Sequence, residues 1–581
     1  MKENTYKRKT IDMFYFNLVS LAFLFFLFSS ISLVLHEGLQ NANGSPVQEV
    51  SNNEIETFQR IFCGLDAKPN SNEYVIEYVL PQKCEMPTGI VFDDKDDKVW
   101  YVSSKKGLLG SYDLDDNKFD LEKIIPEWIS RKNQKGSNQV WDMSIDRKEG
   151  DIWFTDVEQN AIWKYVISSE TFEKYLIPAK SKDFDKSYPI SIEFDTRNDN
   201  IVYFSSSYFP SLWVADINDL ENNTSQGISE IALPINDFKG IDPLYITISP
   251  MVFDNERHVI WVSAMSYGFK GQIYKYDLET MTFDIFDLPK ELSSPWGHTI
   301  DNEGNLWIAN VGSNIFYMFS PDEYYKENEY IEKFSTSKAS YRIFGKIAGN
   351  STEQELQNRY YTLPSFIQTS DDGSIWFNQQ QGNKIAEFDP SDRTLIEYWI
   401  PSQNSEWGPC HIDKEDIVIN SDQCGIANVL QFSLGIDNDN NNNINGNDKE
   451  IWFTEWTENK IGKLEPEDKG LPYSIDIFES DEELTIERGE EEKIKFKIKA
   501  VEESFDNISM IASGTFTTTG YLENSTGYFS DESIELEEGE EKEIAFTFKP
   551  SKDLTPGKYN LMIGAENDAI SILKTVKVTI N

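Results

Sequence analysis

Basic residues are scarce in this chain of 581 residues: 53 lysines and arginines stand against 99 aspartates and glutamates, which gives a net charge of −46. The acidic residues are spread along the chain and do not form a tail. A surface of this kind repels polyanions, which argues against nucleic acid or an anionic membrane surface as a partner. The excess of acidic residues is expected to keep the protein soluble in a saline exterior. The alternative role for these charges is to attract cations.

Cysteine is equally scarce, and the four cysteines show no Cys-x-x-Cys spacing. This argues against a metal site built from cysteines and favours disulfides in an exported protein. Four cysteines allow three pairings, of which sequence proximity favours Cys63–Cys84 and Cys410–Cys424. Glycosylation sequons, which are consistent with a glycoprotein outside the cell, occur at Asn222, Asn223, Asn350, Asn507 and Asn524.

The chain has one long hydrophobic run, residues 13–35, which follows a basic N-terminus. About 23 residues at 1.5 Å each span the roughly 30 Å hydrocarbon core of a membrane. The basic flank is expected to stay inside and the rest of the chain to be exported. We therefore expect residues 1–36 to be an uncleaved signal anchor in the cell membrane, with a cleaved signal peptide as the alternative. The polar residues 37–72 are expected to form a linker.

Beyond the linker, one short phrase recurs: an aromatic pair, a small residue, a turn, then Asn-x-Ile and a strand that bears an aspartate. The clearest copies are 450–466, 151–167 and 374–390, and weaker copies are 98–114, 201–217, 259–278 and 305–321. Repeats of roughly 40–50 residues with alternating apolar strands and Gly/Asp turns are typical of β-propellers. The seven copies predict an all-β, seven-bladed propeller over residues 73–468. Its blades are expected at 84–130, 137–180, 187–236, 243–290, 293–342, 361–402 and 405–466.

The ring is expected to close through its N-terminal strand. Residues 74–81 (YVIEYVLP) resemble the outer strand LIEYWIP at 395–401, whereas no such strand follows the seventh copy. Pairing the first strand with the last blade removes two open sheet edges. Tryptophans at one repeat position are assigned to the core: Trp100, Trp153, Trp261, Trp307, Trp376 and Trp452.

Two further segments stand apart from the repeat. Residues 470–581 contain short strands separated by acidic turns and predict one immunoglobulin-like sandwich, an accessory or adhesion module. The insertion at 435–450 places Asp437, Asp439 and Asn441 at the alternate spacing of a calcium loop. It lacks the glycine and the final glutamate of such loops, so a polar hairpin tip without Ca²⁺ is the alternative.

The repeat resembles the streptogramin lyase (virginiamycin B lyase-like) family, whose NHL-like blades read P-x-G-I, WFTE and N-x-I-G. The resemblance covers about 74–466 and is strongest at WFTEWTENKIGKL, residues 452–464. It implies a propeller that, with Mg²⁺, linearises a cyclic depsipeptide by elimination at its ester. The family's working residues are histidines at the x of P-x-G-I in late blades and glutamates at the WFTE position.

The histidines are not at the expected positions. The x residues are Thr88, Trp141, Ile190, Ser249, Trp296, Ser365 and Cys410. His298 stands where the repeat has isoleucine and is expected to be structural. His411 lies one residue late, so its side chain reaches the axis only if a bulge restores the register. A catalytic His411 acting with Glu455 is therefore kept as the alternative to a propeller that has lost its base.

The polar position of the WFTE motif is better preserved than the histidine position. The residues that follow the aromatic-aromatic-small triplet, or its equivalent, in the seven copies are Ser104, Asp156, Ser206, Ala264, Asn310, Gln379 and Glu455. We expect the four longest, Asp156, Asn310, Gln379 and Glu455, to cluster around one mouth of the channel, with Asp142 nearby. Asp156 and Glu455 could hold Mg²⁺ or Ca²⁺ there. A polar mouth filled with water is the alternative.

Tryptophans are expected on the same face, at Trp141, Trp296, Trp407 and Trp456. Flat rings beside amides and carboxylates suit a glycan or a peptide with apolar groups. Trp141 and Trp296 occupy x positions and are the favoured ligand contacts. The sequence thus favours an anchored, exported binding propeller over a magnesium-dependent carbon–oxygen lyase or a scaffold for surface proteins.

Overall fold

The computed structural model describes most of the chain beyond residue 62. The described residues are 63–64, 68–128, 139–146, 148–178, 187–207, 210–222, 227–235, 238, 241, 246–266, 270–326, 329–339, 361–404, 425–437, 448–466, 470–478, 484–501, 503–516, 522 and 525–581.

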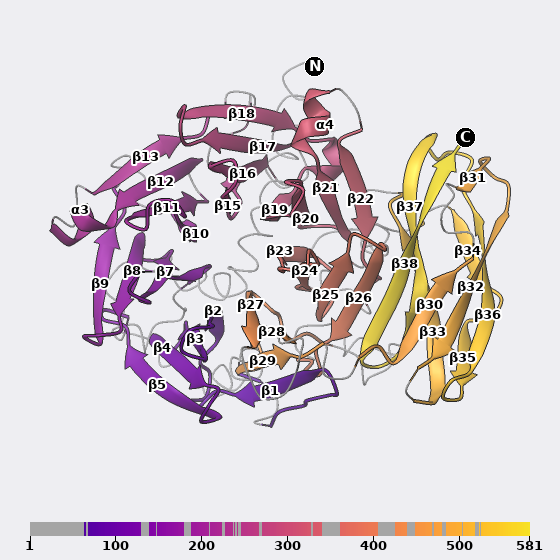
Figure 1. Ribbon diagram of the computed structural model, residues 1–581, viewed down its shortest axis with the longest axis horizontal. Helices are drawn as coiled ribbons and strands as arrows, with labels where there is room; N and C mark the ends of the chain where they lie inside the picture. Colours follow the sequence, from indigo (N-terminus) through magenta and orange to yellow (C-terminus); the bar gives the residue numbers. More distant parts are fainter. Residues whose placement is uncertain are drawn as a thin grey trace, which may run out of the picture.

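The part preceding residue 467 is a ring of antiparallel sheets whose innermost strands face a common axis (Figure 1). The first four sheets contain β2 (Pro87–Asp93), β3 (Lys98–Ser103), β4 (Leu108–Asp113) and β5 (Lys118–Ile124); β6 (Met143–Ile145), β7 (Ile152–Asp156), β8 (Ala161–Val166) and β9 (Thr171–Leu176); β10 (Pro189–Phe194), β11 (Ile201–Ser206), β12 (Ser211–Asp216) and β13 (Ile228–Ala232); and β14 (Thr247–Ile248), β15 (Val252–Asp254), β16 (Val259–Ser266), β17 (Lys270–Asp277) and β18 (Thr282–Asp287).

Three more sheets complete the ring, each again built from the inside outward. They contain β19 (Pro295–Ile300), β20 (Leu306–Asn310), β21 (Ile315–Phe319) and β22 (Ile331–Ser335); β23 (Pro364–Thr369), β24 (Ile375–Gln379), β25 (Lys384–Asp389) and β26 (Thr394–Trp399); and β27 (Phe432–Asp437), β28 (Asp448–Glu455), β29 (Lys460–Leu464) and β1 (Val75–Val79). Short helices α3 (Ile217–Asn222) and α4 (Pro321–Tyr325) connect the third and outer strands of their sheets, and η3 (Lys290–Leu292) follows the outer strand β18.

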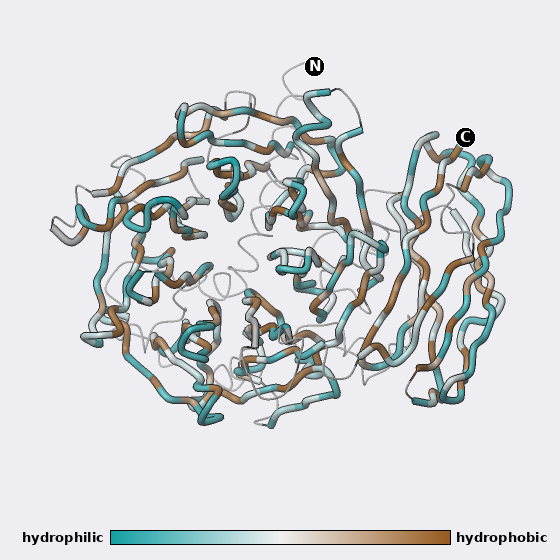
Figure 2. The backbone as a smooth tube through the Cα atoms, in the orientation of Figure 1, coloured by the Kyte–Doolittle hydropathy of each residue, from teal (hydrophilic) through white to brown (hydrophobic). Residues whose placement is uncertain are grey.

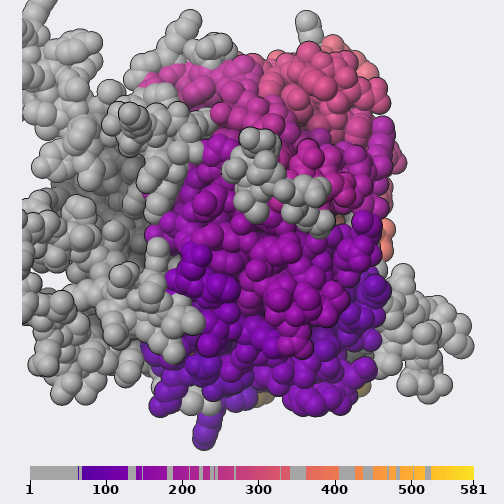
Figure 3. All heavy atoms as spheres, turned by 90° about the vertical axis from the view of Figure 1, so that its left-hand side faces the viewer, coloured from indigo at the N-terminus to yellow at the C-terminus, as the bar shows by residue number. Residues whose placement is uncertain are grey.

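Clusters of buried apolar side chains lie between neighbouring sheets. Hydrophilic residues gather at many of the turns (Figure 2). The six tryptophans assigned to the core are at most 5 % exposed, which confirms that assignment. Viewed from the side, the first four sheets form a continuous packed wall (Figure 3). Such a wall arises because one blade cannot bury its faces alone, so each sheet depends on its neighbours.

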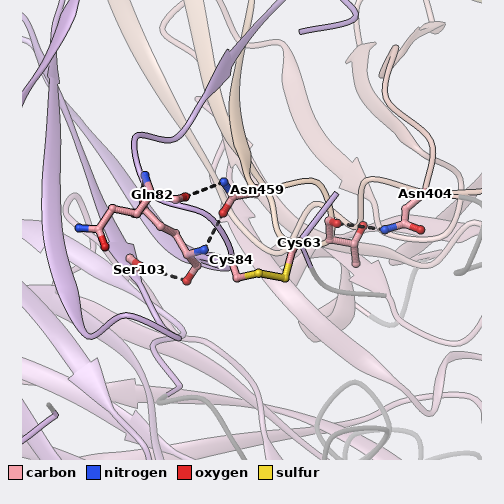
Figure 4. The surroundings of a disulfide bond; sticks show 8 residues. Cys63, Gln82, Cys84, Ser103, Asn404 and Asn459 are labelled. Carbon is pink, nitrogen blue, oxygen red and sulfur yellow. Dashed lines mark hydrogen bonds between the residues drawn. A yellow bond between two sulfur atoms is a disulfide. The ribbon is translucent and has the colours of Figure 1, made fainter. Parts of the chain in front are cut away.

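The N-terminal strand closes the ring, as the sequence predicted. β1 pairs antiparallel with β29, with Val75 opposite Leu464 and Val79 opposite Lys460. The predicted disulfide Cys63–Cys84 is formed beside this joint (Figure 4). The last sheet is therefore assembled from residues nearly 400 positions apart, and its outer strand is secured covalently on one side.

The asparagine of the repeated Asn-x-Ile joins one sheet to the next. Asn459 has a φ of 58°, in the left-handed region that asparagine tolerates better than most residues. Its Nδ2 donates to the Gln82 carbonyl (2.9 Å), and its Oδ1 accepts from the Glu85 N–H (2.5 Å), as Figure 4 shows. The same pair of bonds is made by Asn160 to Ile177 and Ser187, and by Asn383 to Ile400 and Ala427.

Residues 470–581 form two further sheets packed face to face. One contains β30 (Tyr473–Ile477), β32 (Glu492–Ala500), β36 (Glu541–Lys549) and β34 (Thr526–Phe529); the other contains β38 (Ile570–Ile580), β37 (Gly557–Glu566), β33 (Phe505–Gly514) and β35 (Ser533–Leu536), with β31 (Leu484–Ile486) beside β38. A shared cluster of buried apolar side chains fills the space between them. This arrangement is a β-sandwich, at the right of Figure 1.

The sandwich is joined to the ring by a continuous sheet, which the sequence did not predict. β38 pairs antiparallel with β26, the outer strand of the sixth sheet, from Thr394 opposite Lys574 to Tyr398 opposite Ile570. The junction also contains the Arg393–Glu332 ion pair at 2.7 Å. The C-terminal module is therefore docked on the propeller edge and does not hang from a linker.

Several predictions fall on residues outside the described part. They concern the anchor at 13–35, the Cys410–Cys424 pairing, His411, Trp407, Asp439 and Asn441, and the sequons at Asn223, Asn350 and Asn524. Within the described ranges, no helix is long and apolar enough to cross a membrane.

Candidate ligand site at the channel mouth

Two tryptophans from distant sheets contact each other within one apolar cluster. Trp141 precedes β6 of the second sheet, and Trp296 lies in β19 of the fifth. Their ring centroids are 6.4 Å apart with an interplanar angle of 73°, an edge-to-face contact. Only 7 % of Trp141 and 5 % of Trp296 is exposed. The two favoured ligand contacts therefore do come together, and they pack against each other.

The backbone is irregular at both tryptophans. Trp141 lies outside any strand, and β19 shifts register between Pro295 and His298. Both residues thereby escape the alternation that would point them at a neighbouring sheet. Around them lies an apolar cluster from the second to the sixth sheet: Val157, Ile190, Met265, Val311 and Leu363, with Tyr188, Tyr361 and Phe366 partly buried at its edge.

Asp142, next to Trp141, holds sheets together. Its Oδ2 accepts from the Ile192 N–H of the third sheet (2.9 Å), and its Oδ1 accepts from the Gln431 side chain of the seventh (2.8 Å). Burial raises the pKa of Asp142 to about 7, although these donors oppose the shift. All its contacts are inside the protein, so the expected role of Asp142 in ligand binding is replaced by a structural one.

The four polar residues at the WFTE position do not form a ring around the mouth, so that expectation is wrong. Asp156 accepts from the indoles of Trp128 (2.8 Å) and Trp163 (3.0 Å), and Gln379 donates to Glu397 on the outer strand (2.7 Å). Each residue ends a strand, and strand side chains point at the sheet faces. In a propeller these faces meet neighbouring sheets and not the axis.

Asn310 is likewise engaged locally. Its Oδ1 accepts from the Ser294 N–H (3.1 Å), and its Nδ2 donates to Ser313 (2.9 Å), which braces the connection into β19. Trp456 is also buried, with 3 % exposure. Neither residue offers a free polar or aromatic face at the mouth.

Glu455 is fully enclosed at the end of β28. It lies directly opposite Lys460 of β29, and neither carboxyl oxygen has a hydrogen-bond partner in the described part of the chain. Burial, and then the charge of Glu77, raise its pKa well above the usual range. Enclosure therefore favours the neutral, proton-bearing form of the Glu455 carboxyl group.

The residues do not fit the expected cation site. A divalent cation requires ionised carboxylates with free lone pairs. Asp156 already accepts from two indoles and the Gln159 N–H, whereas Glu455 lies in another sheet, where burial raises its pKa and disfavours the ionised form. Among the described residues, no group of three metal-ligating side chains occurs. Of the predicted calcium loop, only Asp437 falls in a described strand, and its backbone pairs with Asp448.

His298 is structural, as expected. Its Nε2 lies 2.6 Å from the Ser263 hydroxyl, a contact between the fifth and fourth sheets. Burial lowers its pKa to about 3, so the ring is neutral. An enclosed imidazole that joins two sheets has no path to a substrate proton.

Sequence reasoning missed two sets of residues that the structure singles out. The repeated asparagines join consecutive sheets, and the motif N-x-I itself carried that signal. Two fully buried ion pairs, Lys384–Glu397 and Lys460–Glu77, occupy equivalent positions in the sixth and seventh sheets. Their signal was the shared Asn-Lys-Ile and Ile-Glu-Tyr in those two copies alone.

No family model and no curated protein matches this sequence. Among solved structures, virginiamycin B lyase from Staphylococcus aureus is 19 % identical, with a TM-score of 0.45 over 68 % of this chain and 99 % of that one. A catalytically inactive variant of that enzyme with quinupristin is 21 % identical over the same shares, with a TM-score of 0.44. The Cps50 β-propeller domain of Myceliophteria thermophila is 9 % identical, with a TM-score of 0.39 over 67 % of this chain and 99 % of that one. These likenesses assign no ligand to this chain.

Proposed function

We propose that this chain is a membrane-anchored, extracytoplasmic binding protein. It consists of a seven-bladed β-propeller and an immunoglobulin-like sandwich, and it takes a small molecule, glycan, peptide or surface protein at the channel mouth. The observation that supports the site is the contact between Trp141 and Trp296 within an apolar cluster contributed by five consecutive sheets. In this proposal the ligand rests on that cluster at the axis.

Binding without turnover is the activity that the described residues support. None of the x positions within the described part carries histidine, and the enclosed His298 is bonded to Ser263. The acid at the WFTE position of the seventh sheet is buried, which favours its proton-bearing form. We therefore propose that the base and the cation site of the resembling lyases have been lost here.

The test is a titration of the full chain in detergent, followed by tryptophan fluorescence, with quinupristin, a glycan panel and a peptide library as probes. Replacing Trp141 or Trp296 with Ala should weaken binding of the active probe at least tenfold, about 1.4 kcal/mol. Tyr528→Ala, at an exposed aromatic of the sandwich, is the control and should bind normally. Unchanged affinity in both tryptophan variants refutes the site, and conversion of quinupristin to a linear product refutes the loss of catalysis.

A further inference from the structure

The sixth and seventh sheets each contain a lysine–glutamate pair that is removed from water. Lys460 Nζ on β29 lies 2.7 Å from Glu77 Oε2 on β1, and Lys384 Nζ on β25 lies 2.9 Å from Glu397 Oε2 on β26. All four side chains have no exposed surface. A buried ion pair carries a large desolvation penalty, so both pairs need a compensating arrangement around them.

The two pairs differ in the residue directly opposite the lysine. Gln379 lies opposite Lys384, and Glu455 lies opposite Lys460. Directly opposite residues share a face, with their Cβ atoms about 5 Å apart. Gln379 donates to Glu397 at 2.7 Å, while its Oε1 lacks a partner among the described residues. Glu455 has a carboxyl group at the same place; both of its oxygens lack such a partner, and burial favours its proton-bearing form.

The carboxyl group of Glu77 is held by backbone donors on both oxygens. The Ser402 N–H donates to Oε1 (2.8 Å), and the Asn70 N–H donates to Oε2 (2.8 Å). Donors fixed in this way stabilise the negative charge that develops on a carboxyl oxygen when its carbon is attacked. An amine, a carboxyl carbon, an oxyanion cradle and a proton-bearing acid are thus enclosed together.

We propose that Lys460 and Glu77 form an intramolecular isopeptide bond, with Glu455 carrying the protons. The ammonium first gives one proton to the Glu77 carboxylate, which makes both groups neutral. Nζ then attacks Cδ of Glu77, and one C–N bond forms. Glu455 gives its proton to the departing hydroxyl as the C–O bond breaks, and it recovers a proton from the nitrogen. One water leaves, and no oxidant or further reactant is needed.

Burial favours this product. The reaction converts two enclosed charges into a neutral amide, which removes the desolvation penalty of the ion pair. The new amide N–H also provides a donor for the unpartnered oxygens of Glu455. The bond would join β29 to β1, so the ring would be closed by a covalent link that reducing agents leave intact.

Peptide mapping of the folded, full-length chain tests the proposal after denaturation, reduction and digestion. We expect a branched peptide that joins the segments containing Glu77 and Lys460, with a mass about 18 Da below their sum because one water is lost. A lysine-specific protease should fail to cut after Lys460. The segments of Lys384 and Glu397 should appear as separate linear peptides, because the amide of Gln379 cannot act as the acid and base that transfers protons.

Exchanging the acid and the amide provides matched variants. Glu455→Gln should yield only linear peptides from a folded chain, because Gln379 shows that an amide fits this position. Gln379→Glu should create a second branched peptide, between Lys384 and Glu397. Recovery of unlinked Glu77 and Lys460 segments from the unmodified, folded protein would overturn the bond. A full yield of branched peptide in Glu455→Gln would overturn the role of the acid.

Discussion

Asn459 secures the joint at which the ring closes, and its replacement by alanine should loosen that joint selectively. The change removes two hydrogen bonds and leaves the Gln82 carbonyl and the buried Glu85 N–H without partners. A lost bond with its stranded buried group costs about 1–3 kcal/mol, and the left-handed backbone adds about 1 kcal/mol for alanine. For the two bonds together, the expected loss of stability is therefore about 3–7 kcal/mol.

Hydrogen exchange of the β1 amides, Val75–Val79, is the appropriate assay, because global melting averages over the whole ring. With the Cys63–Cys84 disulfide reduced, Asn459→Ala should raise exchange in β1 far above that in the other outer strands. Asn383→Ala is the matched control: it removes equivalent bonds between the sixth and seventh sheets. It should leave β1 protected.

One result would refute this reasoning. If β1 in reduced Asn459→Ala exchanges as slowly as in the unmodified protein, the asparagine does not hold the closing strand. A covalent Lys460–Glu77 link would not hide the effect. The backbone hydrogen bonds of β1 can open locally, and its amides exchange, while one side chain still joins β1 to β29. The same assay on Glu455→Gln, which should lack the covalent link, separates the contribution of that link from the contribution of the Asn459 hydrogen bonds.

Three further outcomes follow from described contacts. Burial raises the pKa of Glu85 to about 7, so the unfolded chain ionises first and stability should fall as pH rises from about 4.5 to 7; Glu85→Gln should abolish this decline and gain up to about 3 kcal/mol above pH 7, measured by denaturant titration across pH. Propeller and sandwich should melt in one calorimetric transition because β26 and β38 share a sheet, and an early separate transition of the sandwich would contradict this. Asp156→Ala should destabilise by about 3–5 kcal/mol in chemical unfolding, because the Trp128 and Trp163 indoles lose their acceptor, whereas Asp156→Asn, which keeps one acceptor oxygen, should cost less.

The repeat could be read from sequence because its signals are local. Each copy places a tryptophan such as Trp153 or Trp452 at the same point of a strand, and burial of these rings depends only on the stacking of sheets. Ring closure was readable for the same reason: residues 74–81 look like an outer strand that the seventh copy lacks. The Cys63–Cys84 disulfide followed from proximity to that strand.

The candidate site could not be read in the same way, because side-chain direction at the end of a strand is a tertiary property. The sequence grouped Asp156 and Glu455 as one ring from their shared repeat position. Their strands instead point them at sheet faces, where each finds a different neighbour. Trp141 and Trp296 do contact each other, from irregular backbone near the start of two inner strands, and their role in ligand binding stays a prediction. The strand pairing of β38 with β26 had no sequence signal, since an edge strand accepts a partner through its backbone.

Ring closure concentrates several devices at one joint for a physical reason. Each interface between consecutive sheets is made within a continuous chain, whereas the β1–β29 interface brings together segments almost 400 residues apart and bears the entropy of closing that loop. β1 is also the strand most easily detached, because it is an outer strand and the other three strands of its sheet come from the far end of the propeller sequence. The disulfide, the Asn459 bonds and the Lys460–Glu77 pair all act on this strand, while in the described residues the sixth sheet has an equivalent asparagine and ion pair. The two clusters also differ in the residue opposite the lysine, Glu455 in the seventh sheet and Gln379 in the sixth, and the proposed covalent closure explains an acid at the first of these positions.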